Sequence, residues 1–160
     1  MLIRRAEITD IPDILRLLVQ VCNVHQEIRP DIFKRDGVKY TEADLQELLR
    51  DENRPVWCAL ENGRFLGYCF CQWQEYHDSS VSTDRKELYI DDLCVDESAR
   101  GRGVATALYR HVTAWARSEG CDIITLNVWC GNDPALGFYE KMGMKPRKIT
   151  MEMPLEDNKC

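Results

Sequence analysis

The sequence has little of several features that mark whole classes of protein. No apolar run approaches the ~20 residues that a membrane-spanning helix needs, and the first residues lack the apolar core of a signal peptide. The eight cysteines form no Cys-x-x-Cys pair and have no flanking histidines, so neither a zinc site nor a redox motif is indicated. A net charge of -6 provides no basic face for nucleic acid. We therefore expect a cytoplasmic protein with no metal, membrane or nucleic-acid partner.

What the chain does have is the composition of one globular domain, with 160 residues of which 44% are hydrophobic and 30% charged. We expect this domain to cover residues 1–155 and a frayed tail to cover 156–160. Apolar periodicity predicts an α/β fold with a mixed sheet. The expected strands are 2–8, 56–60, 65–74, 87–95, 123–129 and 145–153. The expected helices are 11–22, 41–50, 104–119 and 133–142.

The most informative stretch is a strand, a glycine-rich turn and a helix between Glu87 and Glu119. Such a turn leaves backbone N–H groups unpaired at the helix N-terminus, which suits a phosphate group. A P-loop would need Gly-Lys-Ser/Thr, which does not follow here. A dinucleotide-binding turn would need a small residue three places after Gly103, where Thr106 stands.

The pattern that does match is Arg/Gln-x-x-Gly-x-Gly/Ala, at Arg100, Gly103 and Ala105. A second block, from Asn132 to Met144, resembles Asn-x-x-Ala-x-x-Phe-Tyr-x-x-x-Gly-Phe. Together these blocks make the chain similar to the GNAT superfamily of acetyl-CoA-dependent N-acetyltransferases. The resemblance implies a central sheet of about six to seven strands with a splayed parallel pair, flanked by about four helices. It also implies a pyrophosphate-binding loop made of Arg100, Gly101, Arg102, Gly103, Val104, Ala105 and Thr106.

The resemblance further implies how the rest of acetyl-CoA is held, with no metal. Pantetheine can pair with an exposed strand edge through its amide groups. In the family pattern, Leu93, Cys94 and Val95 supply that edge, and Asn132 and Ala135 contribute from the last helix. Asn132 could instead be only a helix cap. Tyr139 stands at the family's tyrosine position, where a phenol can bind the cofactor and donate a proton to the departing thiolate.

Two adjacent carboxylates, Asp91 and Asp92, interrupt the apolar central strand. Strand side chains alternate, so the two acids point to opposite faces unless a bulge intervenes. The segment Leu88–Val95 resembles the polyamine and thialysine acetyltransferase branch, Leu-Tyr-x-Glu-Asp-Phe-Phe-Val, whose proposed base corresponds to Asp91. Asp91 is one methylene shorter than the glutamate of that branch, and this favours proton transfer through water. Asp92 as the base and a structural or substrate-orienting role for both acids are the alternatives.

In this family the connection between the first two helices covers the acceptor groove. His25, Arg29, Phe33 and Tyr40 are therefore candidates for substrate contact, although a loop of this composition is also typical of a solvated surface. We expect direct acetyl transfer to a small amine such as a polyamine, an aminoglycoside or an amino-acid derivative. The alternatives are a protein or peptide N-acetyltransferase and a non-catalytic acyl-CoA-binding module. The family also implies a homodimer, through the final strand or the Trp73–His77 segment.

Overall fold

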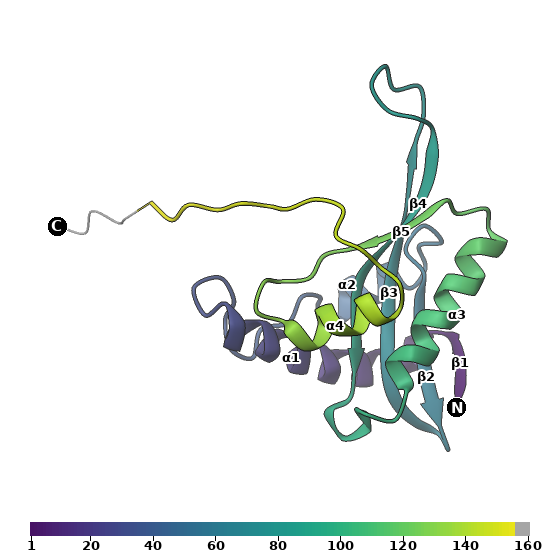
Figure 1. Ribbon diagram of the computed structural model, residues 1–160. Coiled ribbons are helices and arrows are strands. Elements are labelled where there is room, and N and C mark those ends of the chain that lie inside the picture. Colours follow the sequence, from purple (N-terminus) through teal and green to yellow (C-terminus); the bar gives the residue numbers. More distant parts are fainter. Residues whose placement is uncertain (156–160) are drawn as a thin grey trace.

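The computed structural model describes residues 1–155, which form a five-stranded sheet with helices on both faces (Figure 1). The strands lie in the sheet in chain order, and the first three pairings are antiparallel whereas the last is parallel. They are β1 (Leu2–Arg5), β2 (Val56–Glu61), β3 (Arg64–Tyr76), β4 (Arg85–Val95) and β5 (Ile123–Leu126). The α-helices are α1 (Ile11–Ile28), α2 (Glu42–Leu48), α3 (Val104–Ser118) and α4 (Asp133–Lys141). The predicted α/β class with a mixed sheet is confirmed.

The first helix differs from the prediction at both ends. Asp10 stands at the N-cap position, but its carboxylate accepts hydrogen bonds from Arg4 at 2.7 and 3.0 Å and makes no cap bond. The helix continues to Ile28, so His25 lies in its last turn. At the start of α2, by contrast, Thr41 and Asp44 form the predicted capping box.

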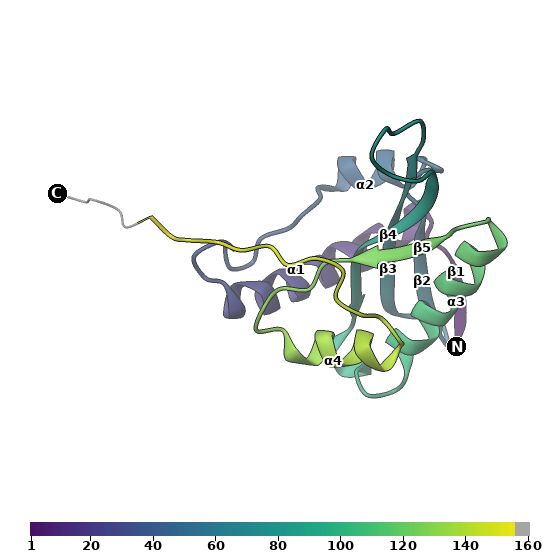
Figure 2. The same ribbon diagram turned by 45° about the horizontal axis from the view of Figure 1, so that its top comes forward.

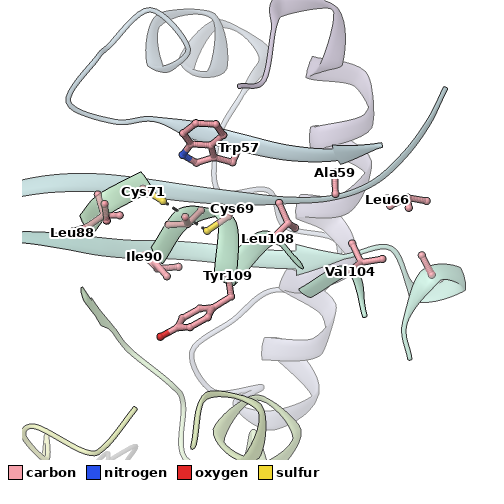
Figure 3. Close-up of a cluster of buried hydrophobic side chains, with 13 residues drawn as sticks. Trp57, Ala59, Leu66, Cys69, Cys71, Leu88, Ile90, Val104, Leu108 and Tyr109 are labelled. Atoms are coloured by element: carbon pink, nitrogen blue, oxygen red, sulfur yellow. Dashed lines mark hydrogen bonds between the residues drawn. The ribbon is translucent and has the colours of Figure 1, made fainter. Parts of the chain in front are cut away.

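Two buried clusters hold the helices against the sheet. On one face, α3 packs on β2, β3 and β4, and its fully buried Leu108 and Val112 belong to one cluster with Ile90. Leu108 and Ile90 are drawn in Figure 3. On the other face, α1 and α2 cover residues such as Phe70 (Figure 2). Removing these apolar surfaces from water is the main driving force for the arrangement. Helix α4 lies at the edge of the α3 cluster, where Tyr139 packs against it.

Glycine residues make two of the predicted turns. Asn62 and Gly63 join β2 to β3 with φ values of 51° and 76°, as a type I′ turn requires. Gly120 ends α3 with a φ of 74°, which is the left-handed conformation expected after a helix. Helix α3 then connects β4 to the parallel strand β5, as predicted.

The register between β3 and β4 shifts once. Phe70 pairs with Asp92 and Cys71 pairs with Ile90, so Asp91 has no partner residue in β3. An extra residue of this kind is a β-bulge, and it changes the direction in which the neighbouring side chains point. The bulge therefore decides how the two acids of β4 are oriented.

The predicted strand 145–153 is wrong, and the sheet accordingly has fewer strands than the expected six to seven. Residues 145–155, which we call the C-terminal arm, run without ladder pairing and leave the body of the molecule (Figures 1 and 2). Alternating apolar residues indicate a strand only if a neighbouring strand is there to pair with. The predicted tail, 156–160, lies outside the described residues.

Candidate active site

A gap in the sheet opens where β4 and β5 separate. The parallel pairing runs from Glu87–Ile123 to Ile90–Leu126 and stops there. Beyond that point β4 stays paired with β3 as far as Val95, while its other edge has no strand beside it within residues 1–155. Leu93, Cys94 and Val95, the predicted pantetheine edge, lie in this open stretch. Their backbone groups on the β5 side are available to an extended ligand with amide groups.

The glycine-rich turn leads from the end of β4 into α3. Gly101 and Gly103 have φ values of 74° and 80°, which favour glycine. The first helical hydrogen bond runs from the N–H of Ala107 to the carbonyl of Gly103 at 3.0 Å, and no side chain caps the helix. The N–H groups of Val104, Ala105 and Thr106 are thus left for an anion, with the helix dipole behind them.

The two arginines of the predicted loop point in different directions. Arg100 is exposed, and its Nε donates to the carbonyl of Val95 at 3.4 Å. Arg102 forms an ion pair with Glu61 at the β2–β3 turn. Of the two, Arg100 is the one held over the open end of β4.

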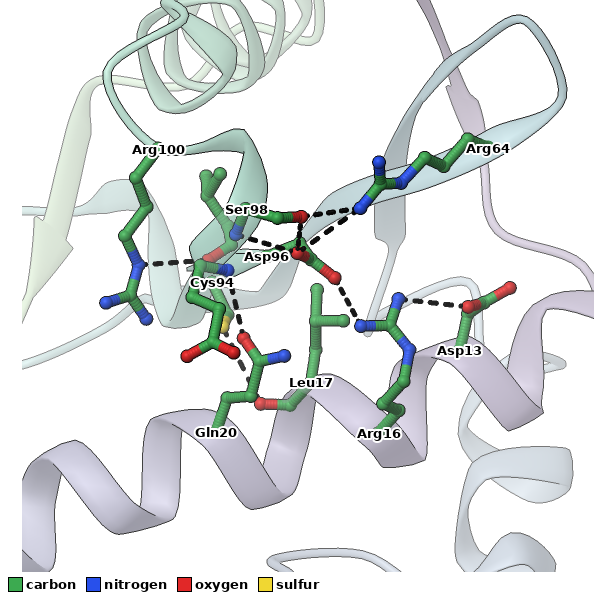
Figure 4. Close-up of polar contacts among 11 residues, drawn as sticks. Asp13, Arg16, Leu17, Gln20, Arg64, Cys94, Asp96, Ser98 and Arg100 are labelled. Atoms are coloured by element: carbon green, nitrogen blue, oxygen red, sulfur yellow. Dashed lines mark hydrogen bonds and ion pairs between the residues drawn. The ribbon is translucent and has the colours of Figure 1, made fainter.

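A buried aspartate that the sequence analysis missed anchors the turn (Figure 4). Asp96 is only 3% exposed, and it accepts hydrogen bonds from Ser98 and from the Arg16 guanidinium of α1. Arg64 lies 3.8 Å away. The bonds from Ser98, supported by Arg16, lower the pKa of Asp96 to about 2 despite its burial. The start of the turn is therefore tied to α1. An Asp two residues before a Ser, directly after a strand, is a cap signal that could have revealed it.

The bulge places both acids of β4 on the face covered by α1 and α2. Asp91 accepts a hydrogen bond from the Tyr40 hydroxyl at 2.9 Å, and Asp92 accepts one from the Tyr68 hydroxyl at 2.8 Å. Tyr40 and Tyr68 both pack against Phe70, with ring centroids 5.6 and 4.8 Å apart. The expectation for an unbulged strand, with the acids on opposite faces, does not apply. We call Asp91 and Asp92 the acid pair.

The two acids have different surroundings. Both oxygens of Asp91 lie 2.7 Å from the Lys39 ammonium. Asp92 has no cation in direct contact among the described residues. Burial raises the pKa of Asp92 to about 6, against smaller opposing effects of Tyr68 and Lys39. A carboxylate with this pKa is suited to accept and release a proton near neutral pH.

Tyr139, on α4, packs against the α3 cluster on the other face of the sheet. Its ring packs against Phe138 at 5.0 Å and against Tyr109 at 6.2 Å between centroids. Burial, with a further contribution from the negative charge of Asp92, raises the pKa of Tyr139. The phenol therefore stays protonated, and it can act as a proton donor.

Asn132 accepts a hydrogen bond from the N–H of Ala135 at 3.3 Å, so it does cap α4.

Three of the predicted acceptor residues gather at the end of α1. Phe33 lies 5.1 Å from His25 and 5.2 Å from Trp129, measured between ring centroids. The Arg29 guanidinium lies 5.8 Å from the Trp129 ring and is paired with Asp31 and Glu152. Burial, together with the charge of Lys39, lowers the pKa of His25, so its ring is neutral near pH 7.

Tyr40, the fourth predicted acceptor residue, lies apart from those three and contacts the acid pair. Sequence reasoning missed Lys39, which lies beside it, and Trp129, which lies beyond the end of β5. A lone lysine in a polar loop carries no signal of its own. Trp129 was the last residue of the predicted strand 123–129, and an aromatic at such a strand end is a usable hint.

Within residues 1–155, no group of three or more His, Cys, Asp or Glu side chains is arranged to hold a metal ion. The same part of the chain contains no helix with the length and apolar character required to span a bilayer.

The comparison with known proteins identifies the family. The profile of the acetyltransferase (GNAT) family matches residues 18–144. The chain belongs to this family. The match covers the acid pair, the glycine-rich turn and α4, so the GNAT resemblance predicted from the two sequence blocks is confirmed.

Several GNAT-family relatives are similar over different lengths. An uncharacterized N-acetyltransferase of Methanocaldococcus jannaschii is 31% identical over 62% of this chain, and the chain covers 42% of that protein. The thialysine N-epsilon-acetyltransferase of Sus scrofa is 24% identical over 90% of this chain and 84% of its own length. The chain thus spans less than two thirds of the archaeal relative, but most of the porcine one.

Solved structures give the same fold. A mutant of the BH1408 protein from Bacillus halodurans superposes with a TM-score of 0.93 at 30% identity, covering 98% of this chain and 100% of that one. A metagenomic aminoglycoside acetyltransferase, solved in complex with trehalose, superposes with a TM-score of 0.72 at 20% identity, covering 97% and 96%. The second likeness shows the fold alone.

Proposed function

We propose that this GNAT-family chain is an N-acetyltransferase that moves the acetyl group of acetyl-CoA directly to the amine of a small molecule. One observation carries the proposal. Asp92, with its raised pKa, lies beyond the last β4–β5 pair on the α1 side of the sheet, and protonated Tyr139 packs on the α3 side, close enough for the charge of Asp92 to act on its pKa. A proton acceptor and a proton donor are the two groups that acetyl transfer to an amine needs.

The residues present fit acetyl-CoA as co-substrate. The unpaired N–H groups of Val104, Ala105 and Thr106 suit the pyrophosphate, and Gly101, Gly103, Arg100 and Arg102 shape its surroundings. The open edge at 93–95 suits pantetheine, next to Asn132, Ala135 and Tyr139 of the α4 segment. When bound, acetyl-CoA supplies the activated acetyl group.

The chain's own residues then handle the protons. An amine with a pKa near ~10 arrives as an ammonium ion, and Asp92 accepts its proton, directly or through water. Backbone N–H groups of 93–95 that face the gap stabilise the charge that develops on the carbonyl oxygen. As the C–N bond forms and the C–S bond breaks, Tyr139 donates its proton to the sulfur, and the nitrogen, which still carries one proton more than the amide product, releases it to water. Asp92 returns its proton to the phenolate through solvent, which closes the cycle.

Of the two acids, we assign the base to Asp92 and an indirect role in substrate orientation, through Lys39, to Asp91. The Asp91 carboxylate is already engaged by the Lys39 ammonium and the Tyr40 hydroxyl, so less of it is free to accept a proton from the substrate. The sequence resemblance had favoured Asp91. The group formed by His25, Arg29 and Phe33 with Trp129 gives the acceptor an aromatic wall beside the loop 29–41.

A small acceptor suits this arrangement better than a peptide. The loop that follows α1 reaches the acid pair through Lys39 and Tyr40, and so covers the acceptor side instead of leaving a long groove. The porcine relative, whose match covers 90% of this chain, is named for acetylating thialysine. Free thiols, such as those of Cys69 and Cys71 at 3.7 Å, suit the reducing cytoplasm that we propose as the compartment.

The test is thiol release from acetyl-CoA with a panel of monoamines, polyamines, aminoglycosides, amino acids and a histone-tail peptide. Binding of acetyl-CoA is measured alongside by calorimetry. We expect turnover on a small amine. Turnover on the peptide alone would indicate a protein acetyltransferase. Tight cofactor binding without turnover on any acceptor would support a non-catalytic module instead.

We also propose that the protein forms a homodimer through the C-terminal arm. Ile149, Met151 and Met153 are about four fifths exposed, although they alternate as in a strand. Arg147 pairs with Glu87 near the start of β5, and Glu152 pairs with Arg29 beyond its end, so the arm runs in the same direction as β5. The free edge of β5 suits the arm of a second copy. If a two-fold axis perpendicular to β5 relates the two copies, the arm of the second copy lies antiparallel to β5 of the first.

Light scattering during size-exclusion chromatography tests the dimer. We expect the wild type to have the mass of two chains and the double variant Ile149→Lys, Met151→Lys to have the mass of one at the same concentration. Thr150→Lys is the control, since it adds a lysine between the two substituted positions but on the other side of the arm, and it should stay dimeric. A monomeric wild type, or a double variant that stays dimeric, contradicts the proposal.

A further inference from the structure

A lysine of this chain occupies part of the proposed acceptor site. The Nζ of Lys39 lies 2.7 Å from both carboxylate oxygens of Asp91. These contacts are the ones that the ammonium group of an amine substrate would make with an acid of the pair. Lys39 is about half exposed, whereas the Asp91 side chain is only 20% exposed, so the contact lies at the mouth of the site.

The residue next to Lys39 is fixed to the core, and this holds the lysine in place. The Tyr40 ring stacks on buried Phe70, and its hydroxyl donates to Asp91 at 2.9 Å. The Arg54 guanidinium in turn donates to the Tyr40 hydroxyl at 2.9 Å. A flexible surface ion pair contributes little because both side chains must be ordered for it to form. Here the backbone is already ordered beside the acid, so the lysine loses less freedom when it pairs.

The lysine changes how many positive charges the site can accept. Two carboxylates and one ammonium leave one net negative charge, since -2 + 1 = -1, and that charge is centred on Asp92. Asp92 receives a hydrogen bond from the neutral Tyr68 hydroxyl, and no cation of residues 1–155 contacts it directly. Arg54, behind Tyr40, adds a second positive charge on the Lys39 side.

We infer that Lys39 is a specificity-determining residue that restricts the acceptor to amines bearing one positive charge near the reacting nitrogen. This inference rests on the proposed acetyl transfer and narrows its substrate class. An acceptor ammonium pairs with Asp92, while Asp91 is neutralised by the chain itself. A second ammonium on the acceptor meets Lys39 at close range or has to displace it from Asp91. Without Lys39, the acid pair becomes a site for a dication, as in a diamine or polyamine.

The test compares n-butylamine with the four-carbon diamine putrescine in wild type and Lys39→Met. The variant should raise kcat/KM for the diamine about tenfold, equivalent to about 1.4 kcal/mol, because two unit charges a few ångströms apart in a partly hydrated site repel each other by an energy of about this size. The readout is the ratio of kcat/KM for the diamine to kcat/KM for the monoamine, which cancels any effect of the substitution common to both amines. Lys39→Arg keeps the charge and should keep the wild-type ratio. Lys34→Met, in the same loop but exposed, is the control for loss of a lysine charge.

Two outcomes overturn the inference. One is a diamine-to-monoamine ratio that Lys39→Met leaves unchanged, and the other is a variant that loses activity on both amines while acetyl-CoA binding persists. Calorimetric binding of each amine in the presence of coenzyme A provides a readout that needs no turnover. If the wild type binds amines but transfers no acetyl group, the proposed function fails, and the binding ratio still tests the role of Lys39.

Discussion

The two sides of the candidate site are built differently. On the cofactor side, one continuous segment from the end of β4 into α3 supplies the backbone N–H groups, and Asp96 ties its start to α1. On the acceptor side, side chains from the loop after α1 and from β3 converge on the acid pair of β4. The cofactor side depends on backbone conformation, whereas the acceptor side depends on which distant segments of the chain come into contact.

This difference has a functional consequence within the family fold. A binding surface made of backbone groups tolerates changes of side chain, provided that the glycines keep their positive φ values. A surface made of side chains changes its specificity with single substitutions. Substitutions on the acceptor side should therefore alter turnover and substrate choice, and those on the cofactor side should alter affinity for acetyl-CoA.

The largest expected effect is on the acceptor side. Asp92→Asn removes the proposed base, and kcat/KM for the amine should fall by about 100-fold or more. Acetyl-CoA affinity should stay within about twofold, since the side chain faces away from the cofactor turn. Asp91→Asn is the matched control: it should raise KM for the amine and change kcat by less than about threefold. The reverse pattern would return the role of base to Asp91.

The pH dependence sharpens the same assignment. Asp92 gains a proton as the pH falls through its pKa of about 6, so wild-type kcat/KM should fall about tenfold for each pH unit below that value. Asp92→Asn should lack this decline. The measurement is a rate profile from pH 5 to 9 at fixed ionic strength, with enzyme stability checked at each pH. A decline that persists in the variant would mean that another group titrates.

A smaller loss is expected for Tyr139→Phe. The variant keeps the ring and its packing against Phe138 but removes the proton donor, so kcat should fall about 30-fold. The dissociation constant of acetyl-CoA should change little. Tyr109→Phe removes a hydroxyl from the neighbouring buried ring and should leave kcat near the wild-type value. Equal effects of the two variants would show that packing, not proton donation, explains the loss.

The same contrast explains what could be predicted from the sequence. Local patterns were sufficient for the Asn62–Gly63 turn, the Thr41–Asp44 capping box and the glycine-rich turn, because each depends on neighbouring residues. The orientation of Asp91 and Asp92 depends on a bulge, which is a property of the pairing with β3. The contact between Lys39 and Asp91 joins segments 52 residues apart.

The wrong strand 145–153 has a related cause. Alternating apolar residues describe which surface a segment offers, and they do not say which strand it pairs with. Ile149 and Met151 carry such a surface with no partner within residues 1–155. Asp10 shows the same limit at smaller scale: it occupies a cap position, but the carboxylate binds Arg4 because β1 places the guanidinium within 2.7 Å.

The smallest expected effect is on the cofactor side. Gly103 has a φ of 80°, and a Cβ there would meet no atom within 4 Å, so Gly103→Ala adds backbone strain without a clash. That strain costs about 1 kcal/mol and should weaken acetyl-CoA binding about fivefold, because the N–H groups of Val104 and Ala105 move out of line. Gly120→Ala introduces the same strain at the other end of α3, at a φ of 74° and again without a contact. Gly120→Ala should lower the melting temperature by about as much as Gly103→Ala does. It should leave the dissociation constant of acetyl-CoA unchanged. If both variants lose affinity equally, the cofactor side responds to global stability, and the contrast between a backbone-built and a side-chain-built half does not hold.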